Sequence, residues 1–139
     1  LDPAEMEKRN IHLQQKYAEI EEKEVRYEEI HCDDAEYLIV AFGSCARIAQ
    51  KAMEEARAEG IKVGLLRPIT LWPFPSKAIA ERSRQVKGIL TVELNAGQMV
   101  EDVRLAVECK VPVEYFGRLG GIVPDPDEVV TALKEKIIK

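Results

Sequence analysis

The segment YLIVAF at residues 37–42, followed by Gly43-Ser44 and then by an amphipathic pattern, decides the fold. A continuous apolar run of this kind is typical of a strand buried on both faces of a parallel sheet. Over residues 45–56 small and apolar side chains recur at helical spacing, and Gly60 marks the end of that helix. The stretch therefore predicts a strand, a turn and a helix, which is the repeating unit of an α/β sheet.

The same rhythm continues along the chain. Further strands are predicted over 62–66, 88–94 and 112–116, and further helices over 76–86, over 98–108 and from Asp125 onward. Asp125-Pro126-Asp127-Glu128 has the residue types of a capped helix start, because Asp caps, Pro suits the first turn and Glu completes a capping box. Alternating strands and helices predict an α/β fold with a doubly wound, mainly parallel sheet.

The first 36 residues differ in charge from the rest. They carry 12 acids and 5 bases, whereas residues 37–139 carry 13 acids and 15 bases, so the net charge of -5 originates in the N-terminal region. We predict two parts: an N-terminal helical arm with a short strand or linker at 1–36, and the α/β domain at 37–139. The strand is expected within residues 24–31, where apolar and polar side chains alternate.

Within the arm, Asp2-Pro3 predicts a helix start, with Glu5 completing a capping box and Leu1 contacting Met6 across the cap. One narrow apolar stripe follows, made of Met6, Leu13, Tyr17 and Ile20. A stripe this narrow suits a helix that lies against a single partner surface, in the same chain or in another.

Composition excludes several classes of function. A chain of 139 residues, 46% hydrophobic and 32% charged, is typical of one globular domain. It is not basic enough for nucleic-acid binding, and no apolar run is long enough to span a membrane. Cys32, Cys45 and Cys109 are far apart, which argues against a disulfide framework or a cysteine-ligated cluster and favours free thiols in a reducing cytoplasm.

The connection RPITLWPFP at residues 67–75 is a candidate interface. Arg67, Pro68, Trp72 and Phe74 combine a cation, a stiff backbone and two large rings, and Trp and Arg are the types that dominate interface hot spots. Because prolines restrict the loop, little conformational entropy is lost when it docks. The alternative is that Trp72 and Phe74 only seal the core of their own domain.

A second candidate is the sequence VELNAGQ at residues 92–98, at the predicted carboxyl end of a strand. Open α/β sheets bind ligands and partners at that edge. Glu93 can accept hydrogen bonds from backbone amides or meet a partner's cation, Asn95 can brace the loop, and Gln98 opens the next helix. No histidine lies nearby to form a proton-transfer pair, so a polar network that orders the loop is favoured over catalysis.

Two glycine-containing turns offer weaker candidates. Ser44 is expected to cap the helix after residue 43, and Arg118, in the GRLGG segment at 117–121, can meet a phosphate or carboxylate. A dinucleotide fingerprint needs further glycines after Gly43 and an acid where Arg67 stands. Adjacent residues such as His31-Cys32-Asp33-Asp34 cannot all converge on one metal ion, so no metal ligands are predicted.

Three motifs, in this order, carry a resemblance to a known family: LLRPITLWPFP at 65–75, VELNAGQM at 92–99 and FGRLGG at 116–121. Together they resemble the C-terminal, transketolase-C-like domain of the α subunit of 2-oxoacid:ferredoxin oxidoreductases, in particular of the 2-oxoisovalerate (branched-chain) type. The resemblance extends over essentially the whole chain, and it implies the three-layer, Rossmann-like fold of that domain.

The resemblance also implies a multi-subunit enzyme, an oligomer that oxidatively decarboxylates a 2-oxoacid, forms an acyl-CoA and reduces ferredoxin. Thiamine diphosphate, magnesium and iron–sulfur clusters are implied for that complex but are expected in its other domains and subunits. This chain then contributes packing surface, with ferredoxin only an indirect partner, and we assign no catalytic, cofactor-binding or metal-binding residue to it. A different class stays open: an independent small-anion or CoA-binding module that uses Ser44 and the 117–121 loop.

Overall fold

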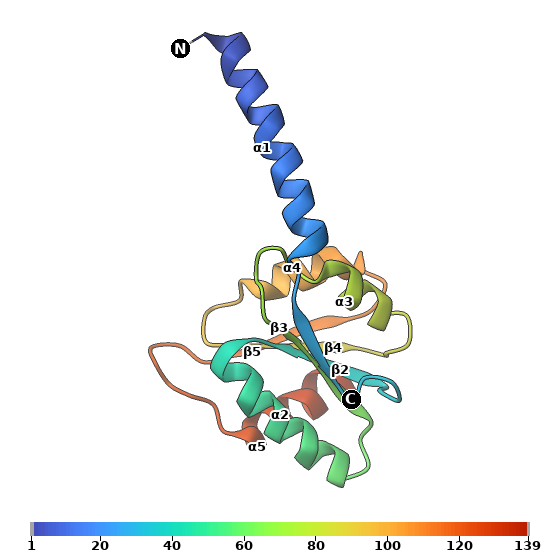
Figure 1. Cartoon of the computed structure of the whole chain (residues 1–139). Coiled ribbons are helices and arrows are strands. Elements are labelled where there is room, and N and C mark those ends of the chain that lie inside the picture. The colour runs from blue at the N-terminus through green and yellow to red at the C-terminus, as the bar shows by residue number, and fades with distance from the viewer. Residues whose placement is uncertain (1, 139) are drawn as a thin grey trace.

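The computed structural model describes residues 2–138 and contains one five-stranded sheet with the order β1-β3-β2-β4-β5 (Figure 1). The strands are β1 (Tyr27–Ile30), β2 (Tyr37–Ala41), β3 (Val63–Pro68), β4 (Ile89–Glu93) and β5 (Val113–Gly117). Neighbouring strands from β3 to β5 are parallel, whereas β1 pairs with β3 in antiparallel register, with Tyr27 opposite Pro68. The predicted α/β class with a mainly parallel sheet is confirmed.

Helices cover both faces of the sheet, which gives three layers (Figure 1). One face is covered by α2 (Gly43–Ala58) and α5 (Pro126–Leu133), which continues into a π-helical turn, η1 (Lys134–Ile138). The other face is covered by α3 (Ser76–Arg82) and α4 (Met99–Val107). Side chains alternate between the faces along β2, so Ile39 enters the core under α2 and α5 while Leu38 and Val40 enter the core under α3 and α4.

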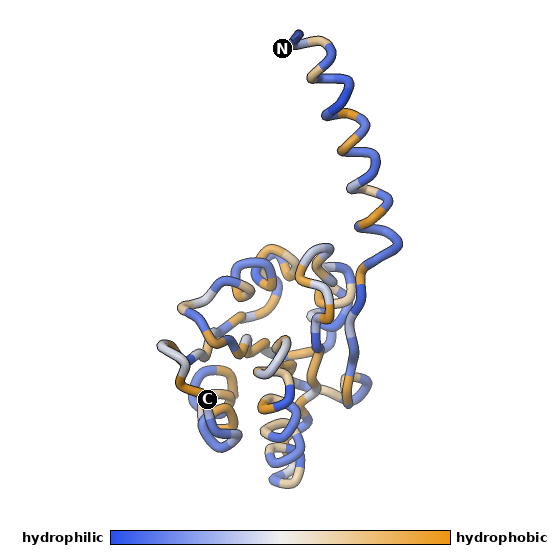
Figure 2. The backbone as a smooth tube through the Cα atoms, turned by 60° about the vertical axis from the view of Figure 1, so that its left-hand side comes forward, coloured by the Kyte–Doolittle hydropathy of each residue, from blue (hydrophilic) through white to orange (hydrophobic). Residues whose placement is uncertain are grey.

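Helix α1 (Pro3–Lys23) extends away from this layered body and has no buried residue (Figures 1 and 2). Most of its large apolar side chains are exposed, with Met6 39% and Leu13 39% exposed, whereas Ile20 is partly covered. The Asp2 carboxylate accepts a hydrogen bond from the Ala4 backbone N–H at 3.1 Å, as the cap prediction requires. The capping box predicted for Glu5 is wrong, because that carboxylate pairs with Lys8 at 2.8 Å. The predicted Leu1–Met6 contact involves Leu1, which lies outside the described residues.

The start of α5 and the end of α3 can be compared with the predicted bounds of those helices. The capping box of α5 is confirmed. The Glu128 carboxylate accepts a hydrogen bond from the Asp125 N–H at 3.0 Å, and the Asp125 side chain accepts one from the Glu128 backbone N–H. Helix α3 is shorter than the predicted 76–86. Beyond Arg82 the N–H groups of Arg84 and Gln85 bond three residues back instead of four, so the chain tightens and leaves the α-helix.

Candidate functional site at the carboxyl edge of the sheet

The predicted site residues gather at one edge, because the parallel strands all end there. Strands β3, β4 and β5 end at Pro68, Glu93 and Gly117, and β2 ends one residue before Phe42. Since β1 is antiparallel, it begins at this same edge, which brings the C-terminal end of α1 next to the loop that follows β3. The edge is therefore where two distant parts of the sequence meet.

Glu93 is fully buried at the last position of β4 and faces the start of α4. Its Oε2 accepts hydrogen bonds from the backbone N–H groups of Gln98 at 3.1 Å and Met99 at 2.8 Å, and its Oε1 accepts from Val100 at 3.0 Å. Free N–H groups at a helix start would otherwise attract an anion. The chain's own carboxylate occupies this position, and the exposed Gln98 contributes its backbone rather than its side chain.

The turn between β4 and α4 is held by Asn95 and Tyr115. The Asn95 Oδ1 accepts from the Gly97 N–H at 2.7 Å, and the Tyr115 hydroxyl donates to the Asn95 carbonyl oxygen. Gly97 has φ +98, a conformation that side-chain-bearing residues rarely adopt. Burial, and secondarily the negative charge of Glu93, raises the pKa of the Tyr115 hydroxyl, so it stays a donor at neutral pH.

Arg118, which follows β5, makes hydrogen bonds to other residues of the chain with both its backbone and its side chain. Its backbone N–H donates to the Glu93 carbonyl at 3.3 Å, and its guanidinium pairs with Glu128, the third residue of α5 and the partner of Asp125 in the capping box. A Cβ at the preceding Gly117 would lie 2.8 Å from the Glu93 carbonyl oxygen, which explains why a glycine is needed where β5 leaves the sheet. The cation therefore links β5 to α5.

Arg67 is also paired, across the antiparallel edge. Its Nη1 lies 2.8 Å from the Glu28 carboxylate on β1, the residue directly opposite it in the ladder. Pro68 is buried at the end of β3, where its missing N–H leaves no unsatisfied donor. The two residues join β1 to β3 at the point where the proline-rich loop begins.

The two aromatic side chains of the proline-rich loop, Phe74 and Trp72, differ in their exposure. Phe74 is half-buried and packs against the core under α3 and α4. Trp72, which precedes a cis proline, is 55% exposed and contacts Tyr17 of α1 edge to face, with ring centroids 5.6 Å apart. Phe74 thus takes the core-sealing role considered above, whereas Trp72 remains open to solvent.

One predicted feature of this edge is wrong. Ser44 does not cap α2, because the helix begins at Gly43 with Phe42 as its N-cap and no side-chain cap hydrogen bond. Gly43 has φ +56, which turns the chain directly from β2 into the helix and leaves Ser44 inside the first turn. The turn proposed to hold an anion through a serine cap is therefore absent.

Most of the apolar surface around the edge was not predicted from the sequence. Exposed apolar side chains follow β3, β4 and β5, and they are Ile69 (49%), Leu71 (48%), Leu94 (42%), Leu119 (57%), Ile122 (56%) and Val123 (61%). The available signal was their position directly after strand ends, in loops with few charges. Such a concentration on one edge of a domain is typical of a protein-protein contact.

The donor set does not fit the cofactors that the resemblance implies for the complex. Iron–sulfur clusters need several converging thiolates. Here Cys45 lies in the core under α2 and α5, Cys32 lies in the core under α3 and α4, and Cys109 is exposed. Burial raises the pKa of Cys32 to about 11, which disfavours the thiolate further. Within residues 2–138 no three His, Cys, Asp or Glu side chains converge as metal ligands.

Membrane insertion has no support among the helices of residues 2–138. None of them combines the length and the apolar character that a bilayer crossing requires.

The geometry defines a class of protein: an open α/β domain. Side chains of the domain itself fill the carboxyl edge of its sheet, and apolar loops surround that edge. Among solved structures, a split-gene transketolase described as an inactive β4 tetramer has this fold, with a TM-score of 0.69 and 22% identity over 79% of this chain and 40% of its own. The sequence model of the pyruvate:ferredoxin oxidoreductase core domain II family matches residues 35–129. The chain belongs to that family.

Its relatives agree with the resemblance stated from the motifs, which is confirmed. The ketoisovalerate oxidoreductase subunit VorB of Methanothermobacter thermautotrophicus (strain Delta H) is 50% identical over 97% of this chain and 38% of its own length. The 2-oxoglutarate synthase subunit KorA of Methanothermobacter marburgensis is 33% identical over 73% of this chain and 27% of its own.

A solved structure of a longer enzyme extends the agreement to three dimensions. The 2-oxoglutarate:ferredoxin oxidoreductase from Magnetococcus marinus, with 2-oxoglutarate, coenzyme A and succinyl-CoA bound, has a TM-score of 0.83 and 26% identity. The match covers 96% of this chain and 23% of that one. The chain thus spans well under half the length of the relatives that it matches.

Proposed function

We propose that this chain is an assembly domain of the α subunit of a 2-oxoacid:ferredoxin oxidoreductase of the 2-oxoisovalerate type. The enzyme as a whole would decarboxylate the 2-oxoacid with thiamine diphosphate, form the acyl-CoA and reduce ferredoxin. The observation that carries the proposal is the 50% identity to a ketoisovalerate oxidoreductase subunit over 97% of this chain, at only 38% of that subunit's length. The chemistry and its cofactors are assigned to the remaining domains and subunits.

The state of the polar groups at the carboxyl edge supports an assembly role. Glu93, Arg67 and Arg118 each pair with a partner inside the chain. Trp72 and the apolar loops after β3, β4 and β5 are the groups left open to solvent. We propose that Arg67, Pro68, Phe74, Glu93, Asn95, Gln98 and Arg118 shape this edge and that Trp72 is its principal contact to other domains or subunits.

The proposal is tested by comparing the chain alone with the reconstituted complex. Purified residues 1–139 are assayed with 2-oxoisovalerate, CoA and a viologen acceptor, and no turnover is expected. The same residues, supplied in trans to co-expressed subunits that lack this domain, are expected to copurify and restore viologen reduction. Turnover by the chain alone, or a complex that assembles and turns over equally well without it, would contradict the assignment.

The second candidate, a free-standing anion or CoA-binding module, is not favoured by these similarities. It relied on a Ser44 cap that is absent and on the 117–121 loop, where the Arg118 guanidinium is paired with Glu128. Calorimetry with CoA and with inorganic phosphate is expected to give no binding heat. The free thiols of Cys32, Cys45 and Cys109 support the proposal of a reducing compartment such as the cytoplasm.

A further inference from the structure

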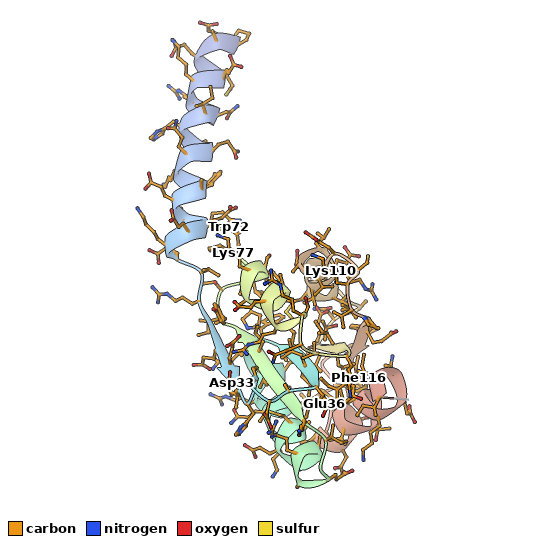
Figure 3. All side chains as sticks on the ribbon, turned by 90° about the vertical axis from the view of Figure 1, so that its right-hand side faces the viewer. Asp33, Glu36, Trp72, Lys77, Lys110 and Phe116 are labelled. Carbon is orange, nitrogen blue, oxygen red and sulfur yellow. The ribbon has the colours of Figure 1, made fainter. Side chains whose placement is uncertain are left out.

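A groove lies between the C-terminal end of α1 and the proline-rich loop, apart from the buried network around Glu93. Its volume is about 690 Å³, and both elements contribute to it. Ala18 of α1 and Val25, two residues after that helix, form one side, and Trp72 to Pro75 form the loop side. Figure 3 shows Trp72 and Lys77 together beside the lower end of α1.

The floor of this groove is fixed in place. Phe74 packs into the core under α3 and α4, and Pro73 and Pro75 are buried. The Thr70 hydroxyl donates to the Pro73 carbonyl at 2.8 Å and accepts from the Arg26 N–H at 3.0 Å, which ties the loop to the segment after α1. A groove with a preformed apolar floor loses little conformational entropy when a partner binds.

The charges on the two sides of the groove are free and opposite. Glu21 and Glu22 line it from α1, and Lys77 lines it from the first turn of α3. Among residues 2–138 none of these three side chains takes part in an ion pair, whereas nearby Glu19 and Glu24 are paired with Lys23 and Arg26. A partner with bases facing α1 would neutralise the two unpaired carboxylates.

We infer that this groove binds an amphipathic protein segment that places apolar side chains on Trp72 and Phe74 and lysine or arginine side chains against Glu21 and Glu22. The inference rests on the proposed function in one respect, since the segment is expected to come from the rest of the oxidoreductase. Complementary charge at the border of an apolar contact fixes orientation and accelerates association. Trp72, 55% exposed at present, becomes buried when the segment binds.

Charge argues against two other occupants. In a two-fold dimer formed through this groove, a second copy would bring its own N-terminal region, with 12 acids against 5 bases, toward Glu21 and Glu22. An anionic lipid surface would meet the same two carboxylates. Like charges placed opposite each other at an interface are destabilising, so both arrangements are disfavoured.

The sole tryptophan provides the readout. Two synthetic 16-residue helical peptides without tryptophan share one leucine face and differ only in flanking lysines or flanking glutamates. Titration of the lysine peptide into the full chain is expected to shift Trp72 emission to the blue and to reduce its quenching by acrylamide. The glutamate peptide is expected to bind about tenfold more weakly or worse.

Matched variants separate the groove from general charge effects. E21K/E22K is expected to reverse the peptide preference, and K77E is expected to tighten binding of the lysine peptide. E7K/E54K makes the same change in net charge at exposed positions away from the groove and is expected to leave binding unchanged. Circular dichroism of each variant verifies that it is folded.

Several outcomes would overturn the inference: no emission shift with either peptide, equal binding of both, or an equal effect of E7K/E54K. A concentration-dependent shift without peptide would assign the groove to a second copy, and a shift with phosphatidylglycerol vesicles alone would assign it to lipid. The proposed function is judged separately, by copurification of the chain with its subunits. A complex that assembles normally although neither peptide binds would refute only the groove inference.

Discussion

The Glu93 carboxylate lies 2.8 Å from the backbone N of Met99, so the last side chain of β4 accepts hydrogen bonds from the first turn of α4. In many open α/β domains this position holds a ligand's anionic group. Here the negative charge is covalently part of the chain and fully buried. The turn between β4 and α4 is thereby ordered by the chain's own carboxylate.

Removing the carboxylate should destabilise the domain. Glu93→Ala leaves the N–H groups of Gln98, Met99 and Val100 without an acceptor, and we expect the free energy of unfolding to fall by about 3 kcal/mol. Glu93→Gln keeps one acceptor oxygen and should lose about half as much. Urea unfolding measures both changes. Glu54→Ala, at an exposed position of α2, is the control and should change stability by less than about 0.5 kcal/mol.

Stability should decrease above pH 9 because of Cys32. Burial, and then the charge of Glu29, raises the pKa of this thiol from 9.0 to about 11. Between these values the unfolded chain loses the proton while the folded chain retains it, so the thiol's contribution to stability is complete below pH 9 and disappears toward pH 11. We expect Cys32→Ala to remove about 2 kcal/mol of that pH-dependent loss. Urea unfolding in reductant at pH 8 and pH 11 measures the difference, and the exposed Cys109→Ala should retain the full slope.

The guanidinium of Arg82 should hold β1 against the body of the domain. It pairs with Glu29 of β1 through two hydrogen bonds of 2.9 and 2.6 Å and also with Asp33. We expect Arg82→Ala to accelerate amide hydrogen exchange in β1 by about tenfold while β4 and β5 stay protected, because only the edge strand loses an anchor. The exposed Arg84→Ala is the matched control. Uniform acceleration in all five strands would mean that Arg82 supports the whole fold instead.

Substitution of Trp72 should impair assembly more than folding. Because its ring is 55% exposed, Trp72→Ala should lower the melting temperature of the isolated chain by no more than a few degrees. Recovery of the reconstituted complex should decrease by about tenfold or more, as for an interface hot spot. Leu105→Ala removes an even more exposed apolar side chain (76%) from α4 and should affect neither measurement. The reverse pattern at Trp72 would make it an ordinary structural residue.

Periodicity was enough to predict the strands of the 37–139 region. Each strand of the 37–139 region begins and ends within two residues of its predicted bounds, because buried parallel strands are short apolar runs bounded by Gly, Pro or Asn. Acceptance of backbone N–H hydrogen bonds was one of the two roles predicted for Glu93. It could be predicted because the donors lie only five to seven residues further along the chain. Local sequence therefore contained most of the information about α4 and its turn.

Contacts between distant segments could not be predicted in the same way. The Tyr115 hydroxyl reaches Asn95 across 20 residues, and Tyr17 meets Trp72 only because β1 runs antiparallel and returns α1 to the edge where β3 ends. The Ser44 cap failed for a different reason. A capping serine and a serine in the first helical turn look alike in sequence, and only the φ of +56 at Gly43 distinguishes them. The division at residues 36 and 37 remains a prediction, although β1 pairs with β3 inside the sheet.

The short link between α1 and β1 has a mechanical consequence. Only residues 24–26 separate the helix from a strand that is hydrogen-bonded into the sheet, so the C-terminal end of α1 is held beside the edge where β1 begins. At 1.5 Å per residue, a helix of 21 residues is roughly 30 Å long. A neighbour that contacts the N-terminal end of α1 would therefore lie about that far from the sheet while still being joined to β1 through one helix.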